Sequence, residues 1–262
     1  MSLERAFETL DNPLIRQFIF YPRRDFTRPP ADATDYFVQV EPGVAISTRL
    51  YTTDKRAPTI LYFHGNGEVV SDHDYIAPTY TTRGINLFVA DYRGYGASDG
   101  LPTFRSVFSD AHPVFREAVR VLSQSGYSAD LFVMGRSLGS APACELAASY
   151  PSELRGFIVE SGFASATRLM RYLGLPIEAP DNGHLPNLSN VRRITLPSLI
   201  IHGQRDSLIP VSEAEAVYEN LPATDKRLLI IEGADHNDIL YIGAAEYFQA
   251  LTEFVFAHRV HR

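Results

Sequence analysis

Short runs of hydrophobic residues alternate with longer amphipathic segments along most of the chain. The first two runs flank Pro42-Gly43, a pair typical of turns, and they predict a hairpin. The six later runs are almost continuously apolar, which is expected of parallel strands buried on both faces of a sheet. The eight runs are 37–40, 44–51, 59–63, 86–90, 131–134, 156–159, 198–201 and 227–231.

The segments between several of these runs have the spacing of amphipathic helices. Helices are predicted over 106–122, 138–150, 213–220 and 244–260. Alternation of strands and helices is typical of an α/β fold with a mostly parallel sheet, right-handed crossovers and helices on both faces. We therefore predict a single domain over residues 1–262, a length that is ordinary for one α/β unit.

Composition and charge exclude several classes of function. Hydrophobic residues make up 45% of the chain and charged residues 21%, as in ordinary folded proteins. The net charge is −7 without a basic block, so nucleic acid is not expected as a ligand, because phosphates are bound by clustered Lys and Arg. The single cysteine excludes an intramolecular disulfide. The charged N-terminal segment and the absence of about 18 consecutive apolar residues predict a cytoplasmic protein without a membrane span.

The sequence Gly135-Arg136-Ser137-Leu138-Gly139 lies between a predicted strand and a predicted helix. Glycines two positions before and after the serine allow the strand and the helix to approach closely at a sharp turn. The N-terminus of the helix also stabilises negative charge that develops near the serine. This context predicts that Ser137 is a nucleophile at a nucleophile elbow, rather than a serine that only caps a helix.

A serine nucleophile needs a general base and a group that orients the base. Asp206 follows the seventh hydrophobic run and His236 follows the eighth, so both are expected at the carboxyl edge of the sheet beside Ser137. Asp235 is an alternative acid, although neighbouring side chains at a loop apex usually point apart. His202 is interpreted as a structural residue that holds the loop of Asp206. We predict a catalytic triad of Ser137, His236 and Asp206.

An oxyanion hole requires two aligned backbone N–H donors. Leu138, which follows the nucleophile, is predicted to supply one of them. The loop after the third run reads His64-Gly65-Asn66-Gly67, and its glycines let the backbone approach a substrate oxygen. The second donor is therefore assigned to Asn66, with a plain glycine turn as the alternative.

Other candidates for chemistry are weaker. Asp72-His73-Asp74 is interpreted as an exposed helix start, because three consecutive residues do not easily converge on one metal ion. The chain has no His-Glu-x-x-His or paired-cysteine motif, so no metal or other cofactor is expected. Cys144 is predicted to fill the core, and Asp91 to hold a neighbouring loop.

These motifs, together with Asp91-Tyr92-Arg93-Gly94-Tyr95-Gly96-Ala97-Ser98 and His202-Gly203-Gln204-Arg205-Asp206, resemble those of abhydrolase-domain serine hydrolases. That group belongs to the α/β-hydrolase superfamily and is related to the catalytic domain of prolyl oligopeptidases. The resemblance extends from about Tyr36 to the C-terminal helix. It implies an α/β-hydrolase fold with about eight strands and a carboxylesterase-like or thioesterase-like serine hydrolase without a cofactor.

The fold alone does not identify the substrate or prove an activity. The expected partner is a small or medium acyl ester or thioester. An amidase or peptidase of the same fold, or a hydrolase-fold protein that binds without catalysis, is the alternative. The sequence does not indicate the oligomeric state.

One connection, over about 163–196, is far longer than the others and contains several prolines and glycines. Long insertions in compact domains are usually functional, so we predict a small lid beside Ser137. Leu169 and Leu173 belong to an apolar group in this insertion and are predicted to bind the acyl chain. The alternative is that these residues only hold the insertion against the body of the domain.

Overall fold

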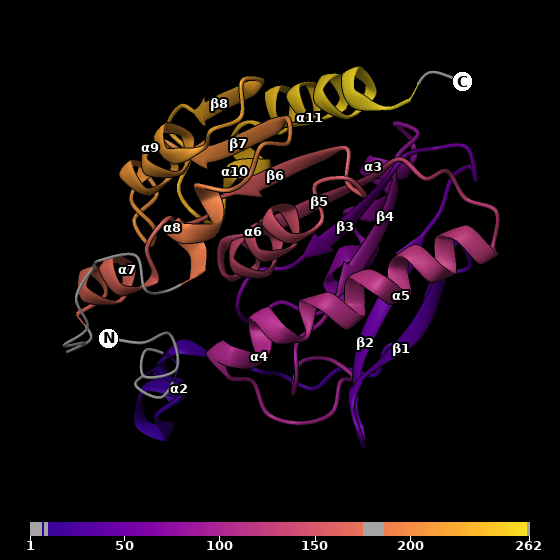
Figure 1. The fold of residues 1–262 in the computed structure, drawn as a ribbon, viewed down its shortest axis with the longest axis horizontal. Helices are drawn as coiled ribbons and strands as arrows, with labels where there is room; N and C mark the ends of the chain where they lie inside the picture. Colours follow the sequence, from indigo (N-terminus) through magenta and orange to yellow (C-terminus); the bar gives the residue numbers. More distant parts are fainter. Residues whose placement is uncertain (1–6, 8–9, 175–185, 261–262) are drawn as a thin grey trace.

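The computed structural model describes the chain except for residues 1–6, 8–9, 175–185 and 261–262. It contains an eight-stranded sheet in the order β1-β2-β4-β3-β5-β6-β7-β8 (Figure 1). Strand β2 is antiparallel to both of its neighbours, and all other neighbouring pairs are parallel. The strands are β1 (Ala33–Glu41), β2 (Val44–Tyr51), β3 (Thr59–Phe63), β4 (Asn86–Ala90), β5 (Leu131–Arg136), β6 (Gly156–Glu160), β7 (Ser198–Gly203) and β8 (Lys226–Ile231). The predicted α/β fold and its mostly parallel sheet are confirmed.

Helices cover both faces of the sheet. The labelled helices are α2 (Pro13–Ile19), α3 (Ala77–Thr81), α4 (Phe104–Ser109), α5 (Ala111–Gln124), α6 (Ser140–Ser149), α7 (Ala166–Tyr172), α8 (Pro186–Val191), α9 (Val211–Asn220), α10 (Ile239–Ile242) and α11 (Ala244–His258), with 3-10 turns η1 (Val70–Asp74) and η2 (Ser137–Gly139). Among the described residues, no helix combines the length and the apolar character that crossing a membrane would require.

The strands bury both of their faces because successive side chains point in opposite directions. On β3, Leu61 and Phe63 pack in the core under α4, α5 and α6, which lie in front of the sheet in Figure 1. Ile60 and Tyr62 pack in the second core with residues of α3 and α11. Burial on both sides explains the nearly continuous apolar runs from which the strands were predicted.

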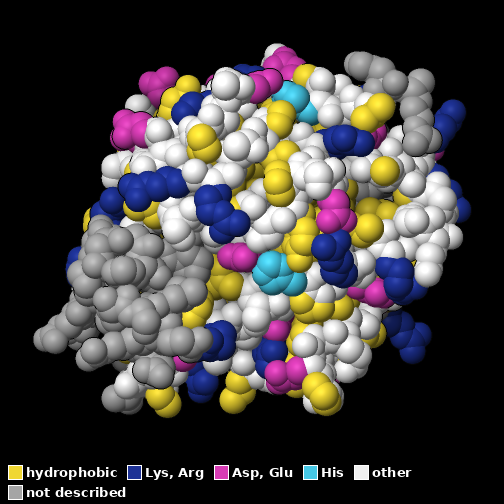
Figure 2. All heavy atoms as spheres, viewed as in Figure 1, with side chains coloured by type: hydrophobic (Ala, Val, Ile, Leu, Met, Phe, Trp, Pro, Cys, Tyr) yellow, Lys and Arg dark blue, Asp and Glu magenta, His cyan; other side chains and the backbone are white. Residues whose placement is uncertain are grey.

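The face covered by α5 and α6 carries interspersed acidic and basic side chains (Figure 2). Arg116 on α5 lies 2.8 Å from the carboxylate of Glu153, and His112 lies 3.3 Å from Glu145 on α6. Acidic and basic side chains therefore pair between neighbouring segments on this face.

The helix predicted over 106–122 is two helices, α4 and α5, that meet at Asp110. Pro113 lies in the first turn of α5 and has no N–H to donate to the carbonyl of residue 109. Asp110 accepts hydrogen bonds from Arg93 Nε and Nη2 at 2.6 and 2.7 Å, which fixes the junction. The helical periodicity continues through this break, so the periodicity alone predicted one helix.

The insertion predicted over about 163–196 contributes α7 and α8 on either side of the undescribed residues 175–185. Helix α7 begins after Ser165, whose hydroxyl accepts a hydrogen bond from the backbone N–H of Arg168 at 3.2 Å. Strand β6 ends immediately before this insertion, which places α7 at the carboxyl edge of the sheet.

The close approach of β3, β5 and α6 depends on glycine at position 139. A Cβ atom there would overlap the carbonyl oxygen of Phe63 at the end of β3. Both groups are backbone and cannot rotate away, so the strand and the turn can be this close only without a side chain.

We predict that Gly139→Ala lowers the free energy of unfolding by at least about 3 kcal/mol, because it overpacks rigid backbone. Gly126→Ala is the control, since its Cβ would meet nothing within 4 Å and only its φ of +73° opposes the substitution. We expect the control to lose about 1 kcal/mol in urea unfolding. Equal losses in the two variants would show that the contact with Phe63 is not a constraint.

Candidate active site

Ser137, His236 and Asp206 lie in hydrogen-bond contact at the carboxyl edge of the sheet. The Nε2 atom of His236 is 3.1 Å from Ser137 Oγ, and its Nδ1 atom is 2.8 Å from Asp206 Oδ2. The three residues follow β5, β8 and β7, respectively, and each is no more than 6% exposed. The structure thus brings together the three residues that the sequence proposed as a triad.

Ser137 is held in an unusual backbone conformation. Its φ is +52°, in the left-handed region that L-residues rarely adopt. The turn η2 begins at Ser137 and leads directly into α6. Sharp strand-to-helix turns of this kind expose a serine hydroxyl at the edge of the sheet. Local strain is therefore concentrated at the residue with the candidate nucleophile.

Asp206 is held by three donors and by His202, whose Nε2 also lies 2.8 Å from the carbonyl oxygen of Ile209. The Oδ1 atom of Asp206 accepts the backbone N–H groups of Leu208 and Ile209 at 3.0 and 2.7 Å, while Oδ2 faces His236 and lies 3.3 Å from His202 Nε2. Burial alone would raise the pKa of Asp206, but the hydrogen bonds from His202, His236 and Ile209 lower it well below the usual range. The carboxylate therefore stays ionised at neutral pH and can accept the Nδ1 proton of His236, and this contact directs Nε2 toward Ser137.

Asp235, the alternative acid, points elsewhere. Its carboxylate accepts the Ser207 backbone N–H at 2.7 Å and the Ser207 hydroxyl at 2.9 and 3.0 Å, and also the backbone N–H of His236 at 2.6 Å. Asp235 thus links the loop of Asp206 to the loop of His236 without contacting the imidazole.

Asn66 lies beside Ser137 and Leu138 in the wall of the same cavity. The carbonyl oxygen of its side chain accepts the Tyr21 backbone N–H at 3.0 Å and the Tyr95 hydroxyl at 2.6 Å, and its amide donates to the carbonyl of Ile19. These contacts fix the side chain, so the backbone N–H is the group of Asn66 that is suited to an oxyanion. The assignment of Asn66 and Leu138 as oxyanion donors stays a prediction.

The N-terminal segment contributes to the site, and our sequence analysis missed it. Helix α2 ends at Ile19, and both Ile19 and Tyr21 line the cavity and bind Asn66. A helix-start signal is present in Asn12-Pro13, since asparagine is favoured at the N-cap and proline at the first helical position. The contact with Asn66 spans more than 40 residues of sequence and has no local signal.

The cavity beside Ser137 has a volume of about 360 Å³ and is mostly apolar. Leu169 and Leu173 of the insertion line it, as the sequence predicted for an acyl site. The full lining among the described residues is Ile19, Tyr21, Asn66, Phe104, Ser137, Leu138, Phe163, Ala166, Leu169, Met170, Leu173, Leu208 and Ile209. Concave apolar cavities with a few polar groups are typical of small-molecule sites.

The interpretation of Asp72-His73-Asp74 as an exposed helix start holds for Asp72, which is exposed in the first turn of a 3-10 helix, but it is wrong for His73 and Asp74. The residues belong to η1, where His73 is buried and Asp74 accepts hydrogen bonds from the buried Arg49 at 2.9 and 3.1 Å. The distant Arg49 therefore stabilises Asp74, whereas the ring of His73 lies 3.3 Å from the carbonyl oxygen of Val69 in the same turn. Within the described part of the chain, no group of three or more His, Cys, Asp or Glu residues is arranged to hold a metal ion.

The other minor expectations agree with the structure. Cys144 lies in the core on α6, and burial raises the pKa of its thiol. Asp91 Oδ1 lies 3.1 Å from His64 Nε2 and accepts the Val70 backbone N–H at 3.0 Å. Asp91 therefore fixes both ends of the loop that contains Asn66.

The sheet order, the serine turn and the position of the three residues define an α/β-hydrolase. The family described as serine aminopeptidase, S33, matches residues 54–177 and 187–240, more than half of the chain, and the chain belongs to this family. The relation to prolyl oligopeptidases stays a prediction.

Two curated relatives and two solved structures illustrate the similarity. The chain is 31% identical over 210 residues to the human alpha/beta hydrolase domain-containing protein 17B, and 32% identical over 209 residues to the 17C protein of Xenopus tropicalis. These alignments cover 75% of this chain but only 66% and 61% of the relatives, so the chain spans less than two thirds of their length.

An esterase of Pyrococcus furiosus superposes with a TM-score of 0.73 at 20% identity, over 90% of this chain and 98% of the esterase. A monoglyceride lipase of Saccharomyces cerevisiae superposes with a TM-score of 0.69 at 16% identity, over 93% of this chain and all of the lipase chain (100%). At these identities the two structures show that the fold is shared.

Proposed function

We propose that this chain is a serine hydrolase that cleaves small or medium acyl esters or thioesters. The continuous hydrogen-bond chain from Asp206 through His236 to Ser137 supports this proposal. In the proposed reaction, Ser137 Oγ attacks the carbonyl carbon while His236 Nε2 accepts the hydroxyl proton. The ionised Asp206 stabilises the imidazolium that forms. His236 then donates the proton to the leaving alcohol or thiol.

The second half of the reaction uses the same groups. Water enters after the leaving group departs, and His236 accepts a proton from it as the water attacks the acyl-Ser137 ester. Breakdown of the tetrahedral species returns the proton to Ser137 and releases the carboxylic acid. The backbone N–H groups of Leu138 and Asn66 are proposed to stabilise the oxyanion in both steps. No cofactor takes part in the proposed chemistry.

The apolar lining beside Ser137 favours an acyl substrate over a free amino terminus. The family description names an aminopeptidase, which must recognise a cationic amine, but the described lining of this cavity contains no carboxylate. Burial of methylene groups against Leu169, Met170 and Leu173 would stabilise a bound acyl chain by about 0.8 kcal/mol for each fully buried group. The esterase and the monoglyceride lipase that share this fold also support an acyl ester as the substrate class.

We predict that Ser137→Ala lowers turnover of p-nitrophenyl butyrate by at least about 10³-fold, because the nucleophile is removed. The circular dichroism spectrum should be unchanged, and a fluorophosphonate probe should label the wild-type protein and not the variant. Retained hydrolysis in Ser137→Ala would refute the assignment of Ser137 as the nucleophile. Failure of the folded wild-type protein to label would favour a non-catalytic binding protein.

The two neighbouring carboxylates provide a matched test of the acid. We predict that Asp206→Asn lowers kcat by about 10⁴-fold, because an amide that donates to Nδ1 stabilises the wrong tautomer of His236. Asp235→Asn keeps an oxygen acceptor for Ser207 and should change kcat by less than about threefold. Comparable losses of kcat in the two variants would refute the assignment of Asp206 as the acid that orients His236.

The insertion is predicted to select for chain length. Leu169→Ala combined with Leu173→Ala should lower kcat/KM for p-nitrophenyl octanoate about tenfold more than for the acetate, since only the longer chain reaches both residues. Leu188→Ala is the control, because this leucine of α8 packs against the core and does not line the cavity. Equal losses for both esters, at unchanged melting temperature, would show that these leucines do not contact the acyl chain.

A further inference from the structure

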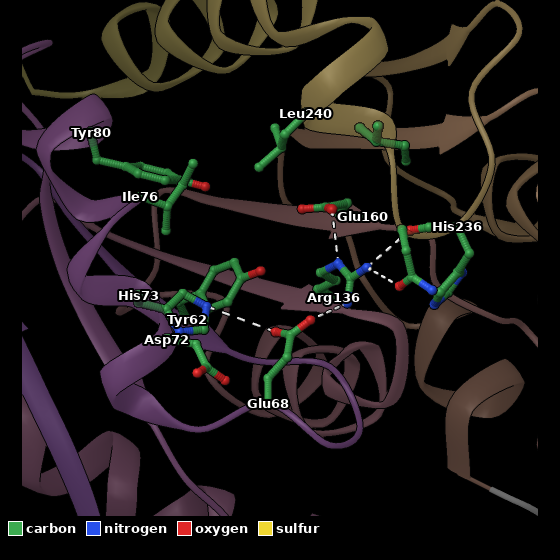
Figure 3. A pocket seen from close by; sticks show the side chains of 12 residues that line it. Tyr62, Glu68, Asp72, His73, Ile76, Tyr80, Arg136, Glu160, His236 and Leu240 are labelled. Carbon is green, nitrogen blue, oxygen red and sulfur yellow. Dashed lines mark hydrogen bonds and ion pairs between the residues drawn. The ribbon is translucent and has the colours of Figure 1, made fainter. Parts of the chain in front are cut away.

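The variable position of the Gly-x-Ser-x-Gly sequence holds an arginine whose side chain is mostly buried. Arg136 ends β5, and its side chain is 14% exposed. Its guanidinium lies at the centre of the group shown in Figure 3, where it meets two carboxylates and the loop of His236. The proposed reaction chemistry does not use this cation.

Each nitrogen of the guanidinium has a partner. Nε donates to Glu160 Oε1 at 3.1 Å, and Nη1 donates to Glu68 Oε1. Nη2 donates to the backbone carbonyl of His236 at 2.9 Å and to Asn237 Oδ1 at 3.0 Å. The planar fork of arginine can satisfy four acceptors in these directions, which the single ammonium of lysine cannot reproduce.

The partners belong to different parts of the site. Glu68 follows Gly67 and accepts the backbone N–H of Gly65 through Oε2 at 3.0 Å, so it holds the loop that contains Asn66. Glu160 ends β6 and accepts the Tyr247 hydroxyl of α11 at 2.7 Å. Arg136 therefore joins the loop of the second oxyanion donor to the loop of the general base.

The charges of this group depend on one another. Burial alone would lower the pKa of Arg136, but Glu68 and Glu160 raise it above its usual range. Burial alone would raise the pKa of Glu68, but the charge of Arg136 is the largest of the effects that lower it. Removal of the guanidinium would leave the buried Glu160 and the partly buried Glu68 without their shared cation.

The tight fit around Arg136 accounts for glycine at position 65. A Cβ atom there would lie 2.5 Å from Arg136 Nη1 and 2.9 Å from Glu68 Oε1. Any larger residue at position 65 would therefore push the Arg136–Glu68 ion pair away from the loop that contains Asn66.

Arg136 does not line the cavity of Ser137. It lines a second cavity, of about 380 Å³, which shares no described lining residue with the first. In Figure 3 the guanidinium contacts the backbone side of His236, through its carbonyl oxygen. His236 also lines this second cavity, whereas the apolar cavity beside Ser137, where the acyl chain is proposed to bind, does not include Arg136.

We propose that Arg136 is a positioning residue, which fixes the loop of Asn66 and the loop of His236 relative to each other without touching the reacting atoms. The inference rests on the proposed hydrolase function for its effect on rate. Misplacement of a catalytic group by about 1 Å can cost on the order of 10²-fold in rate, so the alignment of donor and base is expected to control kcat.

The kinetic test compares two arginines of similar burial. Arg136→Met should lower kcat for p-nitrophenyl butyrate by about 30-fold to 100-fold and change KM by less than about twofold. Arg93→Met is the control, since Arg93 is 15% exposed and also pairs with two carboxylates, Glu41 and Asp110, away from these loops. The control should lose stability but keep kcat within about twofold of wild type.

Two further variants separate positioning from simple stabilisation. Arg136→Lys should recover most of the melting temperature but not kcat, because it restores the charge without the fork. Gly65→Ala should reproduce the loss of kcat while it keeps every charge, and it decides the question if Arg136→Met does not fold. Recovery of kcat by lysine together with the melting temperature would overturn the proposal, as would full activity in Gly65→Ala.

A measurement independent of activity separates this inference from the proposed function. Hydrogen–deuterium exchange should become faster over both 64–69 and 232–238 in Arg136→Met, and over neither segment in Arg93→Met. Unchanged exchange in either loop of Arg136→Met would overturn the positioning role. Retained turnover in Ser137→Ala would instead refute the hydrolase assignment, while the exchange data would still decide whether Arg136 couples the loops.

Discussion

The site depends on backbone segments that pack directly against each other, without intervening side chains, at the carboxyl edge of the sheet. Gly139 lies against the carbonyl of Phe63, so the turn of Ser137 and the loop that begins at His64 are fixed by one contact. A second contact of this kind joins the other two members of the site. A Cβ atom at Gly203 would lie 2.6 Å from the carbonyl oxygen of Ala234, which brings the loop of Asp206 against the loop of His236. Side chains can meet at 2.8 and 3.1 Å because the backbones behind them already touch.

Two clusters of charged and polar side chains then stabilise these packed loops in different ways. The first is Asp206 with His202 and His236, where a carboxylate is kept ionised and one tautomer of His236 is selected. The second is Arg136 with Glu68 and Glu160, where no group faces Ser137. In a low-dielectric interior both groups are stable only while all partners are present, because an unpaired buried charge is costly. The positions of the loops are thereby coupled to the hydrogen bonds and charges that stabilise these buried groups.

The sequence was sufficient for the parts of the fold that depend on local pattern. Strands buried on both faces appear as continuous apolar runs, and a strand–turn–helix with glycines around Ser137 identifies the elbow. Asp206 and His236 could be proposed because each follows a strand of a parallel sheet. The hydrogen bonds that fix the Asn66 side chain and the pairing of Asp74 with Arg49 could not be predicted, since both depend on partners that are distant in sequence. The break between α4 and α5 was missed although Pro113 marked it, because the helical period persists across it.

Because side chains alternate along strand β5, Ser137 and Arg136 lie on different sides of the site, one toward the proposed acyl cavity and the other toward the loops that it holds. Successive residues of β5 point to opposite faces, and the sharp turn after Arg136 sends Ser137 toward the cavity between α4 and α7, whose lining is mostly apolar. Arg136, one residue earlier, lies on the side of Tyr62, Ile76 and Leu240, in the cavity that contains its carboxylate partners. A charged residue next to the nucleophile would cost binding energy if it faced an acyl chain, because its desolvation would have to be compensated. On the opposite side, Arg136 can reach both the backbone of the His236 loop and the loop that contains Asn66. The position between Gly135 and Ser137 is thus the point from which one side chain can hold both loops and leave the acyl cavity apolar.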